Sequence, residues 1–263
     1  MIGRDFNMSD ISIVNGKVLT TQELYDSLEE VGVKKGDVIC VHSHLMAFGK
    51  PLLKRQDFMN VIIDTLNDVI GEKGTLIMPT FTYSFCNKEN YDMQKSPSTV
   101  GILTEYYRKY PNIERTWHPI FSFAIGGNRQ KEYLDIGPDA FSLDSVYGKM
   151  IRDNGKLIML GGNYGYTFYY LAEEHINVRH RYFKNFSGEI ITPQKNYITE
   201  VPYFVRNLTM RSELDEEKLA KYLIETKCQK QVVFAKGTIA AIDCKKMYDY
   251  ICDALRIDQE RFL

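Results

Sequence analysis

Short apolar runs alternate with amphipathic segments along most of the chain. The apolar runs stand at 38–41, 74–78, 121–125, 156–160 and 232–235, and their length is typical of buried strands. Between them apolar residues recur at helical spacing, as at 58–70, where Gly71 follows as a C-terminal cap. This alternation predicts an α/β protein, a three-layer α/β/α fold with a central mixed sheet. Because no linker rich in Pro, Gly or Ser interrupts it, we expect a single domain over residues 1–263.

Capping residues and composition predict the remaining elements. Thr20 and Glu23 form a capping box, which predicts a helix to about Val31. Asp243 is a good N-cap for a last helix, expected to end at Leu255. Further helices are expected from residues 98, 167 and 214, a long surface loop at 84–98, and antiparallel edge strands within 189–205.

Composition narrows the class of partner and compartment. The net charge is -1 and no basic stripe stands out, so we expect no nucleic-acid partner. No apolar stretch approaches the roughly 20 residues that span a bilayer, and the N-terminus lacks the apolar core of a signal peptide. The five cysteines form no CxxC pair, which fits a reducing compartment. We therefore expect a cytoplasmic protein that does not enter the membrane.

Several common site motifs are absent. The chain has no GxGxxG, GxxxxGK[ST] or GxSxG, which counts against dinucleotide, P-loop and α/β-hydrolase chemistry. Alternation along a strand would put Cys40, His42 and His44 on one side, where they could ligate a metal. Cys40 lies inside an apolar run, however, and no carboxylate nearby completes a site. We therefore expect no metal.

Polar and ionisable side chains gather where the predicted strands end. Arg115 and His118 precede the run at 121–125, and Gly161-Gly162 leads from a strand to a helix at Thr167. Loops at strand ends are where an α/β scaffold presents reactive groups. The glycine pair and the helix start at 98–101 also offer backbone N–H groups to an anion. Aromatic residues in these loops suit the walls of a sugar site: Tyr83, Tyr164, Tyr166 and Tyr170.

Five motifs in a fixed order carry a resemblance to a known family. They are Val41-His-Ser43-His-Leu45 with Gly49; Gly74-Thr-Leu-Ile-Met-Pro79-Thr80-Phe; Pro97-Ser-Thr99-Val-Gly101 with Glu105 and Arg108; Arg115-Thr-Trp-His118-Pro119 with Ser122; and Gly155-Lys-Leu-Ile-Met-Leu160-Gly161 leading to Thr167 and Ala172-Glu173. With these motifs, from about Gly36 to Phe186, the chain resembles the aminoglycoside 3-N-acetyltransferase family.

The resemblance implies an acyl-CoA-dependent N-acyltransferase that acts on an amino sugar, with no metal cofactor. It implies that CoA, carrying an acetyl or a longer or hydroxylated acyl group, lies near two segments: Ser43, His44 and Leu45, and Ser98, Thr99, Val100 and Gly101. It places the acceptor near His118 and the segment 167–173. We expect the acceptor to be bound by Thr80, Thr82, Tyr83, Arg115, Tyr166 and Thr167.

One departure from the family concerns the general base. The family usually has His three residues before the Glu of its motif, and this chain has Tyr170 there, three residues before Glu173. A sugar amine must lose its proton before it attacks a thioester. Because an imidazole titrates near 6.5 and a phenol near 10, we expect His118 to be the base. Glu173 would hold the ammonium or orient the base, Tyr170 would hydrogen-bond the sugar or relay a proton, and His175 is the other candidate base.

The charge of the loops bears on the acceptor. Lys88 and Lys95 are mixed with acids after Thr82, and Arg179, Arg181 and Lys184 follow the predicted helix at 167–175. Because a polycationic antibiotic calls for a strongly acidic pocket, we expect a nucleotide-linked amino sugar of surface glycan biosynthesis. An aminoglycoside 3-N-acetyltransferase that confers antibiotic resistance is the first alternative. A non-catalytic CoA- or sugar-binding protein is the second. The sequence leaves room for a homo-oligomer.

Overall fold

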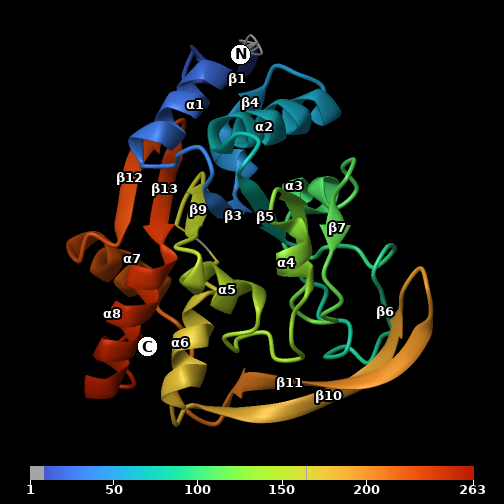
Figure 1. Cartoon of the computed structure of the whole chain (residues 1–263). Helices are drawn as coiled ribbons and strands as arrows, with labels where there is room; N and C mark the ends of the chain where they lie inside the picture. Colours follow the sequence, from blue (N-terminus) through green and yellow to red (C-terminus); the bar gives the residue numbers. More distant parts are fainter. Residues whose placement is uncertain (1–8, 164) are drawn as a thin grey trace.

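A computed structural model describes residues 9–163 and 165–263. Within them the central sheet has the strand order β12-β13-β9-β3-β5-β8-β7 (Figure 1). Its middle strands run parallel: β9 (Lys156–Leu160), β3 (Val38–Ser43) and β5 (Thr75–Pro79). Its outer strands are antiparallel to their inner neighbours: β12 (Gln229–Phe234), β13 (Gly237–Asp243), β8 (Phe123–Gly127) and β7 (Glu114–Arg115). The predicted mixed sheet is confirmed.

Helices cover both faces of this sheet, and the three-layer arrangement is confirmed. One face carries α1 (Thr21–Glu30), α2 (Arg55–Ile70) and α3 (Ile102–Tyr107). The other carries α4 (Gln130–Leu134), α5 (Val146–Arg152), α6 (Tyr169–Ile176), α7 (Glu216–Glu225) and α8 (Cys244–Ile257). Strand β3 shows the alternation that two buried faces require: Ile39 and Val41 pack with α1 and α2, whereas Cys40 packs with α5 and α8.

Local signals in the sequence fix several helix starts. The capping box of α1 is confirmed, because the Thr20 hydroxyl accepts from the Glu23 N–H and the Glu23 carboxylate accepts from the Thr20 N–H. Asp243 caps α8 as predicted, by accepting from the Lys246 N–H. Two starts were predicted too early: α3 begins at Ile102 and α6 at Tyr169. The Gly101 N-cap of α3 has no side chain to mark it, and a tight turn at 165–168 precedes α6.

The described residues also form two smaller sheets of three strands each. One has the order β2-β1-β4, from β1 (Asp10–Val14), β2 (Lys17–Thr20) and β4 (Lys50–Pro51), and the turn η1 (Leu45–Phe48) precedes β4. The other has the order β11-β10-β6, from β6 (Tyr91–Asp92), β10 (Arg181–Ile191) and β11 (Asn196–Arg206).

The antiparallel pairing predicted for 189–205 is confirmed, but these strands do not extend the central sheet. They form a long hairpin that sweeps across one end of the molecule to β6 (Figure 1). The loop 84–98 is also less superficial than predicted. Tyr91 within it is fully buried and donates to the Thr116 carbonyl at 2.9 Å. In the part of the chain that the structure describes, no helix is long and apolar enough to cross a membrane.

Candidate active site

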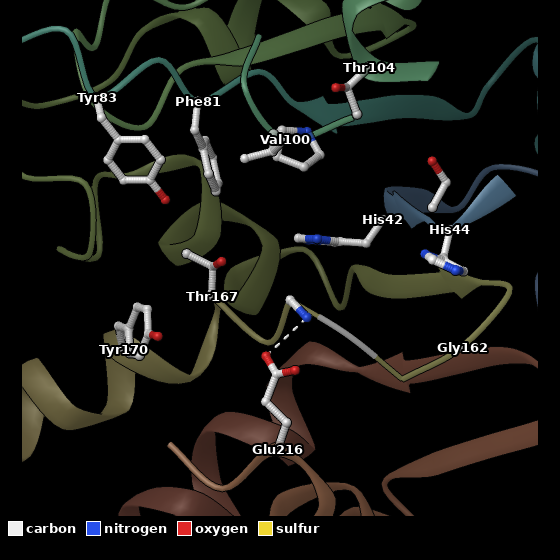
Figure 2. A pocket seen from close by; sticks show the side chains of 13 residues that line it. His42, His44, Phe81, Tyr83, Val100, Thr104, Gly162, Thr167, Tyr170 and Glu216 are labelled. Carbon is white, nitrogen blue, oxygen red and sulfur yellow. Dashed lines mark hydrogen bonds between the residues drawn. The ribbon is translucent and has the colours of Figure 1, made fainter. Parts of the chain in front are cut away.

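A cavity of about 350 Å³ opens at the carboxyl ends of the parallel strands β3, β5 and β9. This is where open α/β sheets bind their ligands. In Figure 2, His42 and His44 lie on one side of it, Tyr83, Thr167 and Tyr170 lie on the other, and Glu216 rises between them. The full lining is His42, Ser43, His44, Pro79, Phe81, Tyr83, Val100, Thr104, Gly162, Gly165, Thr167, Tyr170 and Glu216.

His42 is one of the two imidazoles that line this cavity, and His44 is the other. His42 lies two residues after Cys40 on β3, so strand alternation directs it to the same face. Its ring packs against Gly165, where a Cβ atom would come within 3.1 Å of Nδ1. Its Nε2 is buried and has no hydrogen-bond partner among the described residues. Burial lowers the pKa of His42 from 6.5 to about 4, so the ring is neutral at physiological pH.

Glu216 supplies a carboxylate from a distant part of the sequence. It is the first residue of α7, after the N-cap Asp215. Its Oε1 accepts from the Gly165 N–H at 3.0 Å and from the Tyr166 N–H at 3.4 Å. Glu216 and His42 therefore contact the same loop residue, Gly165. Sequence reasoning missed this carboxylate because acids in the first turn of a helix are common for electrostatic reasons alone.

The structure gathers six of the predicted site residues around the cavity. They are Ser43, His44, Tyr83, Val100, Thr167 and Tyr170. Tyr83 has a positive φ of 55°, an uncommon conformation for a bulky residue and one often found at functional sites. Tyr164, a predicted wall, lies outside the described residues. No group of three potential metal ligands occurs within residues 9–163 and 165–263.

His118, the predicted base, does not line the cavity. Its ring is fully buried, and Nδ1 accepts from the N–H groups of Ile120 and Phe121 at 3.2 and 3.0 Å. These two donors leave the ring proton on Nε2, which lies 3.2 Å from the Pro138 carbonyl oxygen. Burial lowers the pKa of His118 to about 4. Because both nitrogens hold the backbone, this geometry corrects the assignment from general base to support of the loop.

Two further predicted catalytic residues, Glu173 and His175, also lie outside the cavity lining. Glu173 is 1% exposed and is bound on both sides, at 2.7 Å from His180 Nε2 and by the Arg181 guanidinium. It therefore has no oxygen directed at an ammonium group in the cavity. His175 is on the exposed side of α6, where its ring contacts Tyr248. The sequence shows the spacing of these residues but not their partners, which are His180, Arg181 at the start of β10 and Tyr248 on α8.

Four predicted substrate ligands are structural. Arg115 is buried and donates to the carbonyls of Thr80 and Ser96 at 2.5 Å and to the Ser122 hydroxyl at 3.1 Å. Thr80 and Thr82 are buried with it, and Thr82 donates to the Pro119 carbonyl. Tyr166 is buried, and its hydroxyl donates to Gln229 at 3.2 Å. Arg115 thus pins the loop 84–98 to the strand ends, and Tyr166 is tied to β12, so these residues shape the cavity without lining it.

The expected phosphate site at 98–101 offers fewer free amide groups than the sequence suggests. The Thr99 N–H donates to the Phe81 carbonyl, and the Ser98 N–H donates to the Glu105 carboxylate at 2.7 Å. The amide groups of Ser98 and Thr99 are therefore taken, and a carboxylate stands beside them. Val100 is the member of this segment that lines the cavity, so an apolar portion of a ligand fits here better than a phosphate. Leu45, from the other predicted CoA segment, starts η1 and packs on the opposite layer.

A family model described as aminoglycoside 3-N-acetyltransferase matches residues 40–256. The chain belongs to this family. Among curated relatives, an aminoglycoside N(3')-acetyltransferase-like protein from Bacillus subtilis is 27% identical over 60% of this chain and 65% of its own length. Aminoglycoside N(3)-acetyltransferase IV from Salmonella is 30% identical over 57% of each chain. The matches thus span less than two thirds of these two relatives.

Solved structures share the fold of this chain. The apoenzyme of aminoglycoside acetyltransferase AAC(3)-IVa superposes with a TM-score of 0.73 at 23% identity, over 92% of this chain and 90% of that one. AAC-IIIb, solved as a binary complex with CoASH, superposes with a TM-score of 0.76 at 20% identity, over 92% of this chain and 97% of that one.

The expected nucleotide-linked acceptor is wrong. The family model and the named relatives all concern aminoglycosides, the acceptor that was the first alternative. The structure shows why the basic residues of these loops do not predict the acceptor. Arg181 is buried against Glu173, and Arg179 is paired with Glu260 at 2.6 Å, so neither contributes a basic wall to the cavity. The carboxylate of Glu216, which sequence reasoning missed, faces the cavity instead.

The Arg115 cluster generates a stability prediction. Arg115→Met should lower the free energy of unfolding by about 2–4 kcal/mol, because buried carbonyl and hydroxyl groups would lose their donor. Urea denaturation measures this. Arg256→Met is the matched control, since Arg256 is 57% exposed and pairs only on the surface of α8. Equal stability of the two variants would contradict a structural role for Arg115.

The buried His118 generates a pH prediction. Its folded pKa of about 4 lies below the ordinary 6.5, so only the unfolded chain binds this proton between those values. Stability is therefore lost as the pH falls through this window. His118→Asn should destabilise the protein at neutral pH and less so near pH 5, as measured by urea denaturation. A deficit that is equal at both pH values would refute the assignment.

Proposed function

We propose that this protein is an aminoglycoside N-acetyltransferase that moves an acetyl group from acetyl-CoA to the 3-amino group of an aminoglycoside. Family membership supports the reaction class. The observation that carries the proposal is the pairing, in one cavity, of a neutral imidazole with an open nitrogen and a carboxylate from α7. All five cysteines are free, which suits a reducing compartment such as the cytoplasm.

His42 is the base in this proposal. An amine that attacks a thioester must lose a proton, and the acceptor must be an unprotonated group within hydrogen-bond reach. The buried Nε2 of His42 has no protein partner among the residues described, and a buried polar atom of this kind calls for a ligand. The low pKa keeps the ring neutral before the reaction. The nearby Glu216 carboxylate stabilises the imidazolium that forms.

Glu216 also recognises the cationic acceptor. An aminoglycoside carries several ammonium groups, and a carboxylate at the cavity wall attracts them. One oxygen of Glu216 is used by the backbone at Gly165, which holds the group in place. On the other side, Val100, Thr104 and His44 offer a mixed apolar and polar wall for the thiol arm of acetyl-CoA.

His42→Asn should lower kcat for acetylation by about 10²–10⁴, the range for loss of a positioned base. Thiol release from acetyl-CoA with a kanamycin- or gentamicin-type acceptor measures it. His175→Asn is the matched control, because His175 is exposed on α6 and outside the cavity. A His42→Asn enzyme with kcat within threefold of the wild type would exclude His42 as the base.

Glu216→Gln should raise KM for the aminoglycoside by about 10–100-fold, which corresponds to losing one charged hydrogen bond of 1.5–3 kcal/mol. KM for acetyl-CoA should stay constant, since the amide oxygen of Gln can still accept from the Gly165 N–H. Steady-state kinetics with each substrate varied measures both. Glu217→Gln removes the same charge one residue further, outside this cavity, and should leave both values unchanged. A rise for acetyl-CoA instead would place the donor, not the acceptor, at Glu216.

A further inference from the structure

Tyr170 lies on the side of the cavity opposite His42. It belongs to α6, and in Figure 2 its side chain lies beyond Thr167 and Glu216 as seen from His42. The ring is held at its edge by Phe141, whose centroid is 5.8 Å away. Burial raises the pKa of Tyr170 above its usual value of 10, so the phenol keeps its proton at neutral pH. Its hydroxyl is therefore a hydrogen-bond donor at the cavity wall.

A buried cation lies over the face of this ring. The guanidinium of Arg181 stands 4.1 Å from the centre of the Tyr170 ring, within range of a strong cation–π contact. Arg181 opens β10, its side chain is 1% exposed, and its Nη1 donates to the Phe204 carbonyl at 3.1 Å. Glu173 neutralises part of its charge. Even so, Arg181 opposes the effect of burial on the Tyr170 pKa more strongly than Glu173 reinforces it.

The two sides of the cavity therefore differ in the charge they favour. Glu216 favours a cation, such as the amine before it loses its proton. The phenolic O–H of Tyr170, whose ring contacts the Arg181 guanidinium, favours negative charge. In an acyl transfer negative charge develops on the carbonyl oxygen of the thioester, and fixed donors at that point give the largest single contribution to catalysis.

We propose that the Tyr170 hydroxyl donates a hydrogen bond to the carbonyl oxygen of acetyl-CoA and stabilises the oxyanion of the tetrahedral intermediate. This step rests on the proposed acetyltransferase function. The amine nitrogen forms a bond to the thioester carbon, the C=O pair moves onto oxygen, and His42 takes the amine proton. Collapse re-forms the C=O bond, breaks the C–S bond and releases CoA, which takes up the proton. Tyr170 keeps its own proton throughout, and Arg181 is a positioning residue behind it.

Tyr170→Phe tests the role of the hydroxyl, because Phe keeps the ring and its cation–π contact with Arg181 and loses only what the hydroxyl itself provides, including its own interaction with Arg181. The expected result is a fall in kcat of about 10²–10³, as for removal of one oxyanion donor, with KM for either substrate changed less than threefold. Tyr203→Phe is the matched control. Tyr203 is a second phenol that Arg181 affects, and it does not line the cavity, so kcat should stay within twofold. A Tyr170→Phe enzyme with normal kcat, or with only a raised acceptor KM, would overturn the proposal.

A double-mutant cycle tests the positioning role of Arg181. Arg181→Lys keeps the charge but loses the planar group that lies on the ring. It should lower kcat several-fold in the wild type and have no further effect in the Tyr170→Phe background. An equal loss in both backgrounds would show that Arg181 acts on the fold rather than through Tyr170.

Incorporation of 3,5-difluorotyrosine at position 170 supplies a readout that a structural role would not move. The fluorinated phenol is more acidic, so it should lose its proton, and the enzyme its kcat, at a lower alkaline pH than the wild type. The charged and titratable groups that face this phenol are the same in both proteins: Arg181, Glu173, Arg206, Tyr83, Tyr169 and Tyr203. An unshifted alkaline limb would overturn the proposal. A wild type without acetyltransferase activity would overturn the proposed function as well, whereas an active wild type with normal Tyr170 variants would overturn the oxyanion role alone.

Discussion

The close approach of three backbone segments at the strand ends sets the shape of this site. Where the chain leaves β9, Gly161 donates to the Thr238 carbonyl at 2.8 Å. A Cβ atom on Gly161 would lie 2.4 Å from the His44 carbonyl oxygen, and one on Gly237 would lie 2.4 Å from the Gly161 carbonyl oxygen. Only glycine fits at either position. Because the segments meet this tightly, the loop after Gly161 turns across the end of β3 and closes one wall of the cavity against His42.

The fold could be predicted from the sequence because its signals are local. Alternating apolar runs, the capping box at Thr20 and the N-cap Asp243 depend only on neighbouring residues, and each has its expected structural counterpart. The roles of individual site residues depend on partners that are distant in sequence. His118 carries an imidazole that could act as a base. The carbonyl oxygen of Pro138, twenty residues later, lies within hydrogen-bond distance of its Nε2. Glu216 reaches the site from α7, which lies beyond the part of the chain that carries the family motifs.

The charge that faces the acceptor also depends on partners that are distant in sequence. Formal charges along the sequence count Arg179 and Arg181 as basic groups near the site. In the structure Arg179 is paired on the surface and Arg181 is buried with Glu173. A buried cation acts over a few ångströms on what it contacts, and a paired surface cation acts weakly on anything. The charge that a ligand meets is therefore set by burial and pairing more than by composition.

The pairing of Tyr170 with Arg181 follows from the same principle. Tyr170 and Glu173 lie three residues apart on α6, and Glu173 binds the guanidinium that stacks on the Tyr170 ring. An imidazole at position 170 would have to gain a proton while facing that guanidinium, and a like charge at this distance lowers its basicity. A phenol avoids the conflict, because its ring face attracts the cation and its hydroxyl stays neutral. Because Arg181 is buried beneath α6, a hydrogen-bond donor at position 170 is favoured over a base. In the proposed mechanism the proton is therefore taken by His42, on the opposite wall of the cavity.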